Sequence, residues 1–329
     1  MREATSEATW AAQAVQPAAV AEALRRLDGS RPGGQPGWVR TATTTVMAIV
    51  AGPDVPATRA VLRDLCAHEP VRVVVVAVAD GGGDPCDAQV AVRRFGTRGA
   101  ARSAADVVVR VAPPASPGNL LAVVDAVRLP NQPVVAWAPG PPPSGTIRMP
   151  ELAAMADRLV VDTRTLSATV VGEVVTVAPL VPVVDLGWVA LAPWRRLLAG
   201  LFAGPDFTPW LERVVRMEVT GGQGVRRLLG GWLVSRLGLE GEAVRHADGP
   251  TGVALHARSG DAVATFSLTS VAGDHVVALA SVPDGPSHRR LQVIPTPSTA
   301  ELLAAAVAER APDPVWHAAL VSGCPLVRR

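Results

Sequence analysis

The sequence contains no lysine and no tyrosine, so all 31 of its positively charged side chains are arginine. The absence of lysine excludes Schiff-base chemistry, the lysine of a phosphate-binding P-loop and the catalytic lysine of protein kinases. The absence of both residues also excludes the tyrosine–lysine pair of short-chain reductases. Composition alone therefore rules out several large classes of enzyme.

Cysteines and long apolar runs are also scarce. Cys66, Cys86 and Cys324 lie far apart and form no C-x-x-C pair, so the spacing indicates neither a zinc site nor a disulfide framework. A small number of widely separated cysteines is typical of a reduced, cytoplasmic protein. The most apolar window, 174–194, is interrupted by prolines and an aspartate, and the first ten residues lack the apolar core of a signal peptide. We therefore expect no membrane anchor.

The remaining composition is that of a globular protein. Hydrophobic residues make up 49% of the chain and charged residues 18%, a balance that is atypical of disordered proteins. The net charge of +2 gives no reason to expect nucleic acid as a partner. A chain of 329 residues is long for a single core, so two domains are expected.

The first half of the chain predicts an N-terminal arm, residues 1–40, followed by an α/β domain, residues 41–165. The arm contains one helical pattern and a Gly- and Pro-rich stretch. Beyond it, apolar strand patterns alternate with helical patterns, which predicts βαβ crossovers and a mostly parallel sheet. Strands are expected at 43–52, 71–80, 88–96, 132–140 and 160–163, and helices at 57–70, 119–130 and 149–159.

The second half, residues 166–329, predicts an α+β domain with an antiparallel sheet. A strand at 211–220 and a helix at 224–238 precede four strand patterns that are joined by short turns, which require antiparallel neighbours. These four strands are expected at 251–258, 262–270, 274–282 and 289–295. A closing helix at 299–311 is expected to cover one face of this sheet.

No catalytic set emerges from the motifs. The glycine-rich stretch 79–87 follows a strand but lacks the lysine of a phosphate loop, and 220–224 lacks the third glycine of a dinucleotide fingerprint. The segment 285–289 has Arg289 in place of the second glycine of a nucleophile elbow. The histidines form no metal-binding pair, and the paired carboxylates lie in polar turns. We therefore expect no cofactor and no metal.

The segment DLGWVALAPWRRLLAGLF, residues 185–202, is the most distinctive part of the chain. Pro193 marks the first turn of a helix, and Trp194 begins an apolar face that continues at the i+3, i+4, i+7 and i+8 positions. Arg195 and Arg196 lie outside that face, in a first turn where the helix dipole disfavours cations. They are expected to serve an acceptor elsewhere, either in the fold or on a partner, or else to be solvated.

Tryptophan is concentrated near this segment. Trp188, Trp194 and Trp210 fall close together, whereas the rest of the chain has only five more. An indole on an apolar helix face is usually part of a core, which is the interpretation favoured for Trp194. Tryptophan and arginine are also enriched at interface hot spots. If Trp188 and Trp210 reach the surface, they indicate a protein partner.

The pattern D-L-G-W-x-x-L-x-P-W-R, residues 185–195, resembles the OpcA family of glucose-6-phosphate dehydrogenase assembly proteins of cyanobacteria and actinobacteria. The resemblance covers most of residues 40–310. Other stretches that match the family, in the same order, are TATTTVMAIVA at 41–51, LPNQPVVAWAPGPPP at 129–143, ADRLVVDT at 156–163 and LLGGWLVSRLG at 228–238. The strand at 134–138 departs from the pattern, because it has one tryptophan where relatives often have two.

The resemblance implies a protein that is not an enzyme but an assembly factor or allosteric activator. Its partner would be glucose-6-phosphate dehydrogenase, the first enzyme of the oxidative pentose phosphate pathway. The expected partner-binding residues are Trp188, Pro193, Trp194, Arg195, Arg196, Trp210, Trp137 and Pro139. In cyanobacteria the family is linked to redox control by thioredoxin, and Cys66 and Cys86 could pair if the fold brings them together.

An alternative remains open from the residues alone. The carboxyl ends of parallel strands in the α/β domain form a natural ligand crevice. Arg93, Arg94 and Arg98 could hold a phosphate group there. The chain would then be a sugar-phosphate or nucleotide-binding enzyme, or a regulator that senses a small ligand.

Overall fold

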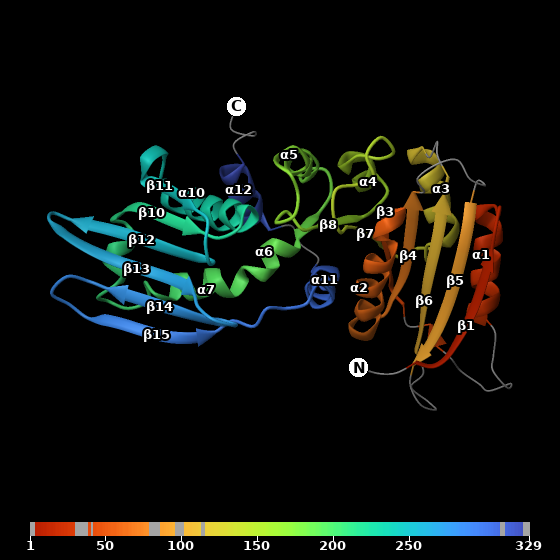
Figure 1. Cartoon of the computed structure of the whole chain (residues 1–329), viewed down its shortest axis with the longest axis horizontal. Coiled ribbons are helices and arrows are strands. Elements are labelled where there is room, and N and C mark those ends of the chain that lie inside the picture. Colours follow the sequence, from red (N-terminus) through yellow and green to blue (C-terminus); the bar gives the residue numbers. More distant parts are fainter. Residues whose placement is uncertain are drawn as a thin grey trace. The chain divides into compact units, whose positions relative to one another are not determined.

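The computed structural model of the chain describes residues 4–29, 39–40, 42–78, 86–95, 102–112, 116–309 and 313–324, and it divides into two compact units. The first unit comprises Met1–Asp162, Thr176–Val184 and Thr299–Ala311. The second comprises Thr163–Val175, Asp185–Ser298 and Pro312–Arg329. Each unit contains its own sheet (Figure 1).

The sheet of the first unit is mostly parallel, as predicted. Its strand order is β1-β5-β6-β4-β3-β7-β8-β9, and β2 pairs with β6. The strands from β6 through β8 run parallel, whereas β5 is antiparallel to both β6 and β1. The strands are β1 (Ala4–Ala12), β2 (Val39–Arg40), β3 (Thr44–Ala51), β4 (Val71–Val78), β5 (Cys86–Phe95), β6 (Arg102–Val111), β7 (Val134–Ala138), β8 (Arg158–Val161) and β9 (Val183–Asp185).

The central strand β4 shows why this sheet is parallel. All eight of its residues are buried, which is the pattern of a strand covered on both faces. Arg72 is the one charged residue of β4, and its Nη1 donates a hydrogen bond to the carbonyl of Val127 at 2.9 Å. Because that bond satisfies part of the guanidinium, the arginine can lie inside an otherwise apolar layer.

Helices cover both faces of this sheet (Figure 1). Helix α2 (Val55–His68) packs on β3 and β4, while α3 (Pro117–Val127) packs on β4 and β6 and contacts α1 (Pro17–Gly29). Helix α3 begins where Ser116 accepts a hydrogen bond from the Asn119 amide and proline occupies the first turn, both of which favour a helix start. A short helix, α4 (Met149–Ala154), precedes β8.

Four strands of this sheet are not predicted from the sequence: the short β2 and β9, and the longer β1 and β6. Strand β6 lies between β5 and β4 and contains the buried Asp106. Strand β1 comes from the region expected to be an arm with one helix, and it pairs with β5 from Ala4 to Ala12. The first forty residues therefore contribute an edge strand and, through α1, part of the covering layer.

The second unit contains a six-stranded sheet in the order β11-β10-β12-β13-β14-β15. The predicted hairpins are present, since β10, β12, β13, β14 and β15 pair antiparallel in this order. Strand β11 adds a parallel edge strand next to β10. The strands are β10 (Val214–Thr220), β11 (Val244–Ala247), β12 (Gly252–Ser259), β13 (Ala262–Ser270), β14 (His275–Ser281) and β15 (Ser287–Val293).

One face of this sheet is buried beneath helices. Alternate residues of β13, among them Ala264, Phe266 and Leu268, are fully buried, and Phe266 stacks on Phe202 with ring centroids 4.1 Å apart. The helices of the second unit are α6 (Leu186–Ala190), α7 (Ala192–Gly200), α8 (Thr208–Leu211), α9 (Gln223–Val225), a π-helical turn at Arg226–Gly230, α10 (Gly231–Leu237) and α12 (Pro314–Gly323). Helix α5 (Ala168–Val177) begins in the second unit and ends in the first.

The expectation that the closing helix covers the antiparallel sheet is wrong. Helix α11 (Thr299–Ala308) belongs to the first unit, where it packs against α2 with Leu302, Leu303 and Ala306 buried. The irregular, proline-containing stretch 294–298 separates α11 from β15. An apolar helix pattern requires a surface to cover but does not specify which sheet provides it, so the sequence leaves this choice undetermined.

Candidate functional site

The distinctive segment 185–202 folds as the end of β9, then α6, then α7. Pro193 lies in the first turn of α7, as predicted, and the helix runs Ala192–Gly200. Trp194 and Leu198 are buried on its apolar face, which confirms that Trp194 is a core residue. Pro193 is partly exposed and Arg196 is exposed. The segment therefore has one face in the core of the second unit and one face toward solvent.

Asp185, the first residue of the segment, is a buried hydrogen-bond acceptor. Its side chain is 1% exposed and accepts from the Thr163 amide at 3.1 Å and from the Thr163 hydroxyl. It also accepts from the Gly187 amide at 2.8 Å, which caps α6, and from Trp316 Nε1 at 3.0 Å. A buried carboxylate is tolerated when several donors surround it. Asp185 therefore joins three separate stretches of the second unit.

Trp188 is part of the same buried structure and does not reach the surface. It is 5% exposed, and its Nε1 donates to Asp313 Oδ2 at 2.6 Å, while Asp313 also caps the start of α12. The condition under which Trp188 would indicate a partner is therefore not met. Its hydrogen bond and burial give Trp188 a role in holding α6 against α12.

Arg195 has its acceptor within the fold. Its Nη1 donates to the Trp188 carbonyl at 2.6 Å, and its guanidinium lies over the Trp188 ring with Cζ 3.3 Å from the centroid. Burial lowers the pKa of Arg195 to about 10, which leaves the guanidinium charged at neutral pH. This contact explains why the arginine lies in a helix first turn, where the dipole disfavours it.

We expect the neighbouring arginines to differ in their effect on stability. Arg195→Met should lower the free energy of unfolding by about 2 kcal/mol, because it removes a charge-assisted hydrogen bond and a cation–π contact. Arg196→Met, at an exposed site, should change it by less than about 0.5 kcal/mol. Urea unfolding of the two variants measures the difference, and equal destabilisation would contradict the proposed role of Arg195.

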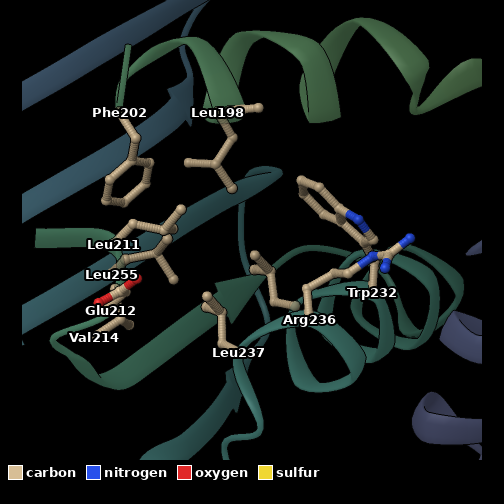
Figure 2. Close-up of a pocket in the computed structure, with 11 residues that line it drawn as sticks. Leu198, Phe202, Leu211, Glu212, Val214, Trp232, Arg236, Leu237 and Leu255 are labelled. Carbon is tan, nitrogen blue, oxygen red and sulfur yellow. The ribbon is translucent and has the colours of Figure 1, made fainter. Parts of the chain in front are cut away.

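An apolar groove lies beside α7 in the second unit. It has a volume of about 520 Å³ and is bounded by α7, α8, α10 and the strands β10 and β12. Figure 2 shows its apolar side chains converging from these elements. They include Leu198, Phe202, Leu211, Leu237 and Leu255. We call this feature the α7–α10 groove.

The two ends of the α7–α10 groove carry opposite charges. Arg236 and the Trp232 indole lie side by side at one end, four residues apart on α10, while Glu212 lies toward the other (Figure 2). Both Arg236 and Glu212 are exposed, and neither forms an ion pair with another residue in the described part of the chain. The groove therefore offers an apolar floor between a free cation and a free anion.

Trp210 borders this groove through its neighbours. It is partly exposed and lies directly before Leu211 and Glu212, which line the groove. The Arg213 guanidinium lies 5.7 Å from its ring centroid. Of the three clustered tryptophans, Trp210 is thus the one with substantial accessible surface. The exposed Arg196 also lies near the groove, because it is one helical turn before the groove residue Ala199 on α7.

Trp137 and Pro139 lie in the first unit, at the end of β7. They line a cavity of about 410 Å³ at the carboxyl ends of β3 and β7, the point where the strand order reverses. Trp137 is 2% exposed, and its Nε1 has no hydrogen-bond partner among the described residues. Among the described residues, Asp54 is the charged residue in the cavity lining, and no arginine contributes to it. A carboxylate without a described cation beside it disfavours phosphate groups.

Arg93 is the one of the three arginines expected to hold a phosphate whose side chain is described, and it does not line this cavity. Arg93 lies on β5, where its guanidinium is 3.3 Å from Glu7 Oε1 and 3.5 Å from Asp106 Oδ2. The side chain of Arg94 and the whole of Arg98 lie outside the described residues. The arginine with a described side chain is thus engaged in ion pairs away from the crevice.

Cys66 lacks the features of a redox-active cysteine. Cys66 on α2 is a free thiol, and burial together with the nearby Asp106 raises its pKa to about 12. Reactive cysteines have a lowered pKa, so this thiol is a poor nucleophile in the described conformation. The side chain of Cys86 lies outside the described residues, and its pairing with Cys66 stays a prediction.

The described residues contain neither a metal-binding cluster nor a membrane-spanning helix. Within the described residues, no group of three or more histidine, cysteine, aspartate or glutamate side chains could hold a metal ion. Over the same part of the chain, no helix is both long and apolar enough to cross a membrane.

Comparison with known families identifies both halves of the chain. Residues 63–175 match the model described as the N-terminal domain of the glucose-6-phosphate dehydrogenase subunit. Residues 181–320 match the model described as the C-terminal domain of the same protein. The chain belongs to the OpcA family. No curated protein matches it. In this OpcA-family chain, the D-L-G-W-x-x-L-x-P-W-R pattern contains the buried contacts of Asp185, Trp188 and Arg195.

The sequence identifies some of these site residues and misses others. Trp188, Trp194 and Arg195 hold the segment together, which leaves Pro193, Arg196 and Trp210 as the accessible members of the expected set in the second unit. Residues of the α7–α10 groove, such as Trp232 and Arg236, were not among the expected residues. The one sequence signal for them is their position in LLGGWLVSRLG, the stretch that resembles the family.

Proposed function

We propose that the chain binds glucose-6-phosphate dehydrogenase and promotes its active form, without catalysing a reaction itself. The observation that carries this proposal is the match of both halves of the chain to models described as domains of a glucose-6-phosphate dehydrogenase subunit. The chain would act as an assembly factor or allosteric activator in the cytoplasm, at the first step of the oxidative pentose phosphate pathway.

The α7–α10 groove is the proposed centre of the docking surface. A stable protein interface buries about 1,200 to 2,000 Å² in total, and apolar side chains at its centre supply most of the affinity. The groove provides an apolar floor with Arg236 and Glu212 at its ends. Arg196, one turn before Ala199, and Trp210, next to Leu211, would extend this surface, and tryptophan and arginine are the residues most enriched at such sites.

A matched pair of leucine variants tests the groove. Leu211 lines the groove and is 40% exposed, whereas Leu121 lies on α3 of the first unit and is 37% exposed. We expect Leu211→Arg to weaken binding of the dehydrogenase from the same organism at least tenfold, about 1.4 kcal/mol, because a charge replaces an apolar contact. Leu121→Arg should leave the affinity within about twofold of the original protein.

Surface plasmon resonance with immobilised dehydrogenase measures these affinities, and a parallel assay measures dehydrogenase activity across substrate concentration with and without the chain. A lower apparent Michaelis constant or a higher maximal rate supports activation. Equal loss of binding in both leucine variants would remove the groove from the interface. Absence of both binding and activation under reducing and oxidising conditions would contradict the proposed function.

The alternative of a sugar-phosphate or nucleotide-binding enzyme, or of a ligand sensor, has less support. The cavity at the carboxyl ends of β3 and β7 has the position expected of a ligand site, but the described part of its lining contains a carboxylate and no arginine. Calorimetric titration with NADP and with glucose 6-phosphate tests it, and we expect no binding at millimolar ligand.

A further inference from the structure

Strand β15 is an exposed edge of the second sheet. It is the last strand in the order (Figure 1). All seven of its residues are exposed. Leu291 is 62% and Val293 is 61% exposed, which are high values for large apolar residues. Proteins often protect such edges with proline or a β-bulge, but β15 contains no proline and pairs with β14 without a register shift.

The ladder between β14 and β15 determines which backbone groups are free. The Ile294 amide donates to the Asp274 carbonyl at 2.8 Å, and the Val282 amide donates to the Pro286 carbonyl at 3.4 Å. Hydrogen-bonded pairs alternate along an antiparallel ladder, so the even-numbered residues of β15 point their backbone groups at β14. The residues whose N–H and C=O groups point to the open edge are Ser287, Arg289, Leu291 and Val293.

The exposed apolar side chains belong to these same residues. Leu291 and Val293 are two residues apart, so their side chains share one face of the sheet. Leu291 lies opposite the partly exposed Val277 of β14 in the ladder. A strand that paired with the free backbone groups of β15 would therefore also cover Leu291 and Val293.

The charge of this edge selects the kind of strand that fits. Arg289 and Arg290 are adjacent, and neither β14 nor β15 contains a carboxylate. The carboxylates nearest in the chain lie beyond the strand ends: Asp284 is in the turn, and Asp274 accepts a hydrogen bond from Thr296. A fully overlapping antiparallel pairing with β15 of a second copy would place Arg290 opposite Arg290, which is unfavourable. An acidic strand has the complementary charge.

We propose that β15 is a docking edge for an extended acidic segment of a partner protein, which adds a strand to the sheet. Backbone hydrogen bonds to the outward groups of β15 provide the affinity in this recognition mode, and side-chain contacts provide the specificity. The segment would place two adjacent carboxylates opposite Arg289 and Arg290. It would place two apolar residues, separated by one position, opposite Leu291 and Val293.

The probe is a capped peptide of sequence Val-Thr-Val-Glu-Glu-Val-Thr-Val, which presents this pattern in both parallel and antiparallel orientations. Fluorescence anisotropy of the labelled peptide with the full chain measures binding. We expect the peptide to bind at least tenfold more tightly than its counterpart with Lys-Lys at the centre. The double variant Arg289→Glu, Arg290→Glu should reverse this preference. Arg245→Glu on β11, the edge strand at the other end of the same sheet, should not.

Backbone methylation distinguishes strand pairing from charge attraction alone. Two further peptides carry N-methyl groups on alternate backbone nitrogens, one on the odd and one on the even positions. If the peptide adds a strand, one of the two should lose binding at least tenfold, because its blocked nitrogens face β15, and the other should keep it.

Three outcomes would overturn the proposal. They are failure of the Glu-Glu peptide to bind, equal binding of both methylated peptides, and an unchanged preference in the Arg289→Glu, Arg290→Glu variant with its fold intact by circular dichroism. A dimer of the chain alone that dissociates in Leu291→Lys, detected by sedimentation velocity, would instead assign this edge to a second copy. None of these results depends on binding of glucose-6-phosphate dehydrogenase.

Discussion

Replacing Asp185 with alanine should lower the free energy of unfolding of the second unit by about 4 kcal/mol. The carboxylate is 1% exposed and accepts hydrogen bonds from the Thr163 amide and hydroxyl, the Gly187 amide and Trp316 Nε1. Alanine leaves these donors in a buried site without their acceptor, and each unsatisfied donor costs about 1 to 3 kcal/mol. It also removes the cap of α6.

Urea unfolding followed by tryptophan fluorescence measures this effect. The signal comes largely from the second unit, which contains Trp188, Trp194, Trp210, Trp232 and Trp316 of the chain's 8 tryptophans. Asp206→Ala is the matched control, because Asp206 is exposed in the same unit, and it should change stability by less than about 0.5 kcal/mol. Similar midpoints for the Asp185 and Asp206 variants would contradict the role assigned to the buried carboxylate.

The elements of the fold were predictable where apolar periodicity is strong. Strand β4 is apolar at nearly every position, and the helix containing Leu62 and Leu65 follows a clear stripe. Strand β1, by contrast, has the polar sequence ATSEATWAA, and its strand conformation depends on pairing with β5. Long-range pairing of this kind leaves a weak local signal, because strand preference depends largely on neighbouring strands.

The candidate site was predictable only in part, for a related reason. The pattern around Pro193 correctly indicates a helix and a buried Trp194. It does not indicate that Trp188 is buried, because the residue that accepts its hydrogen bond, Asp313, is 125 positions away. The α7–α10 groove depends in the same way on Leu198, Leu211, Leu237 and Leu255, which come from separate elements.

The main role of the distinctive segment, residues 185–202, is therefore structural, and any docking at the groove depends on that structure. Asp185, Trp188 and Arg195 position α6 and α7, and α7 then presents Leu198 and Phe202 to the groove. Substitutions of Asp185, Trp188 or Arg195 would affect partner binding indirectly, because they would destabilise the second unit. A double change of Arg195 and Arg196 would mix the two effects, so Arg196→Glu alone is the cleaner test of a charged contact with a partner.

A glycine in the other family-like stretch, LLGGWLVSRLG, determines how closely α10 and α12 approach. A Cβ atom at Gly231 would lie 2.1 Å from the Ala319 carbonyl oxygen and 2.7 Å from the Gly323 amide nitrogen. Both are backbone atoms of α12, so the clash cannot be relieved by turning a side chain. The two helices pack against each other at this point and have to separate to admit a methyl group.

We therefore expect Gly231→Ala to lower the free energy of unfolding by at least about 3 kcal/mol, a size typical of overpacking in a core. The same substitution at Gly200, which ends α7 and has no heavy atom within 4 Å of the added Cβ, should be neutral or stabilise by up to about 1 kcal/mol. Unfolding by urea with fluorescence detection compares the two. The added methyl group is the same in both variants. A loss of stability in Gly231→Ala alone would therefore attribute that loss to the contact between α10 and α12. Similar losses of stability in both variants would instead attribute it to a general intolerance of these helices to alanine.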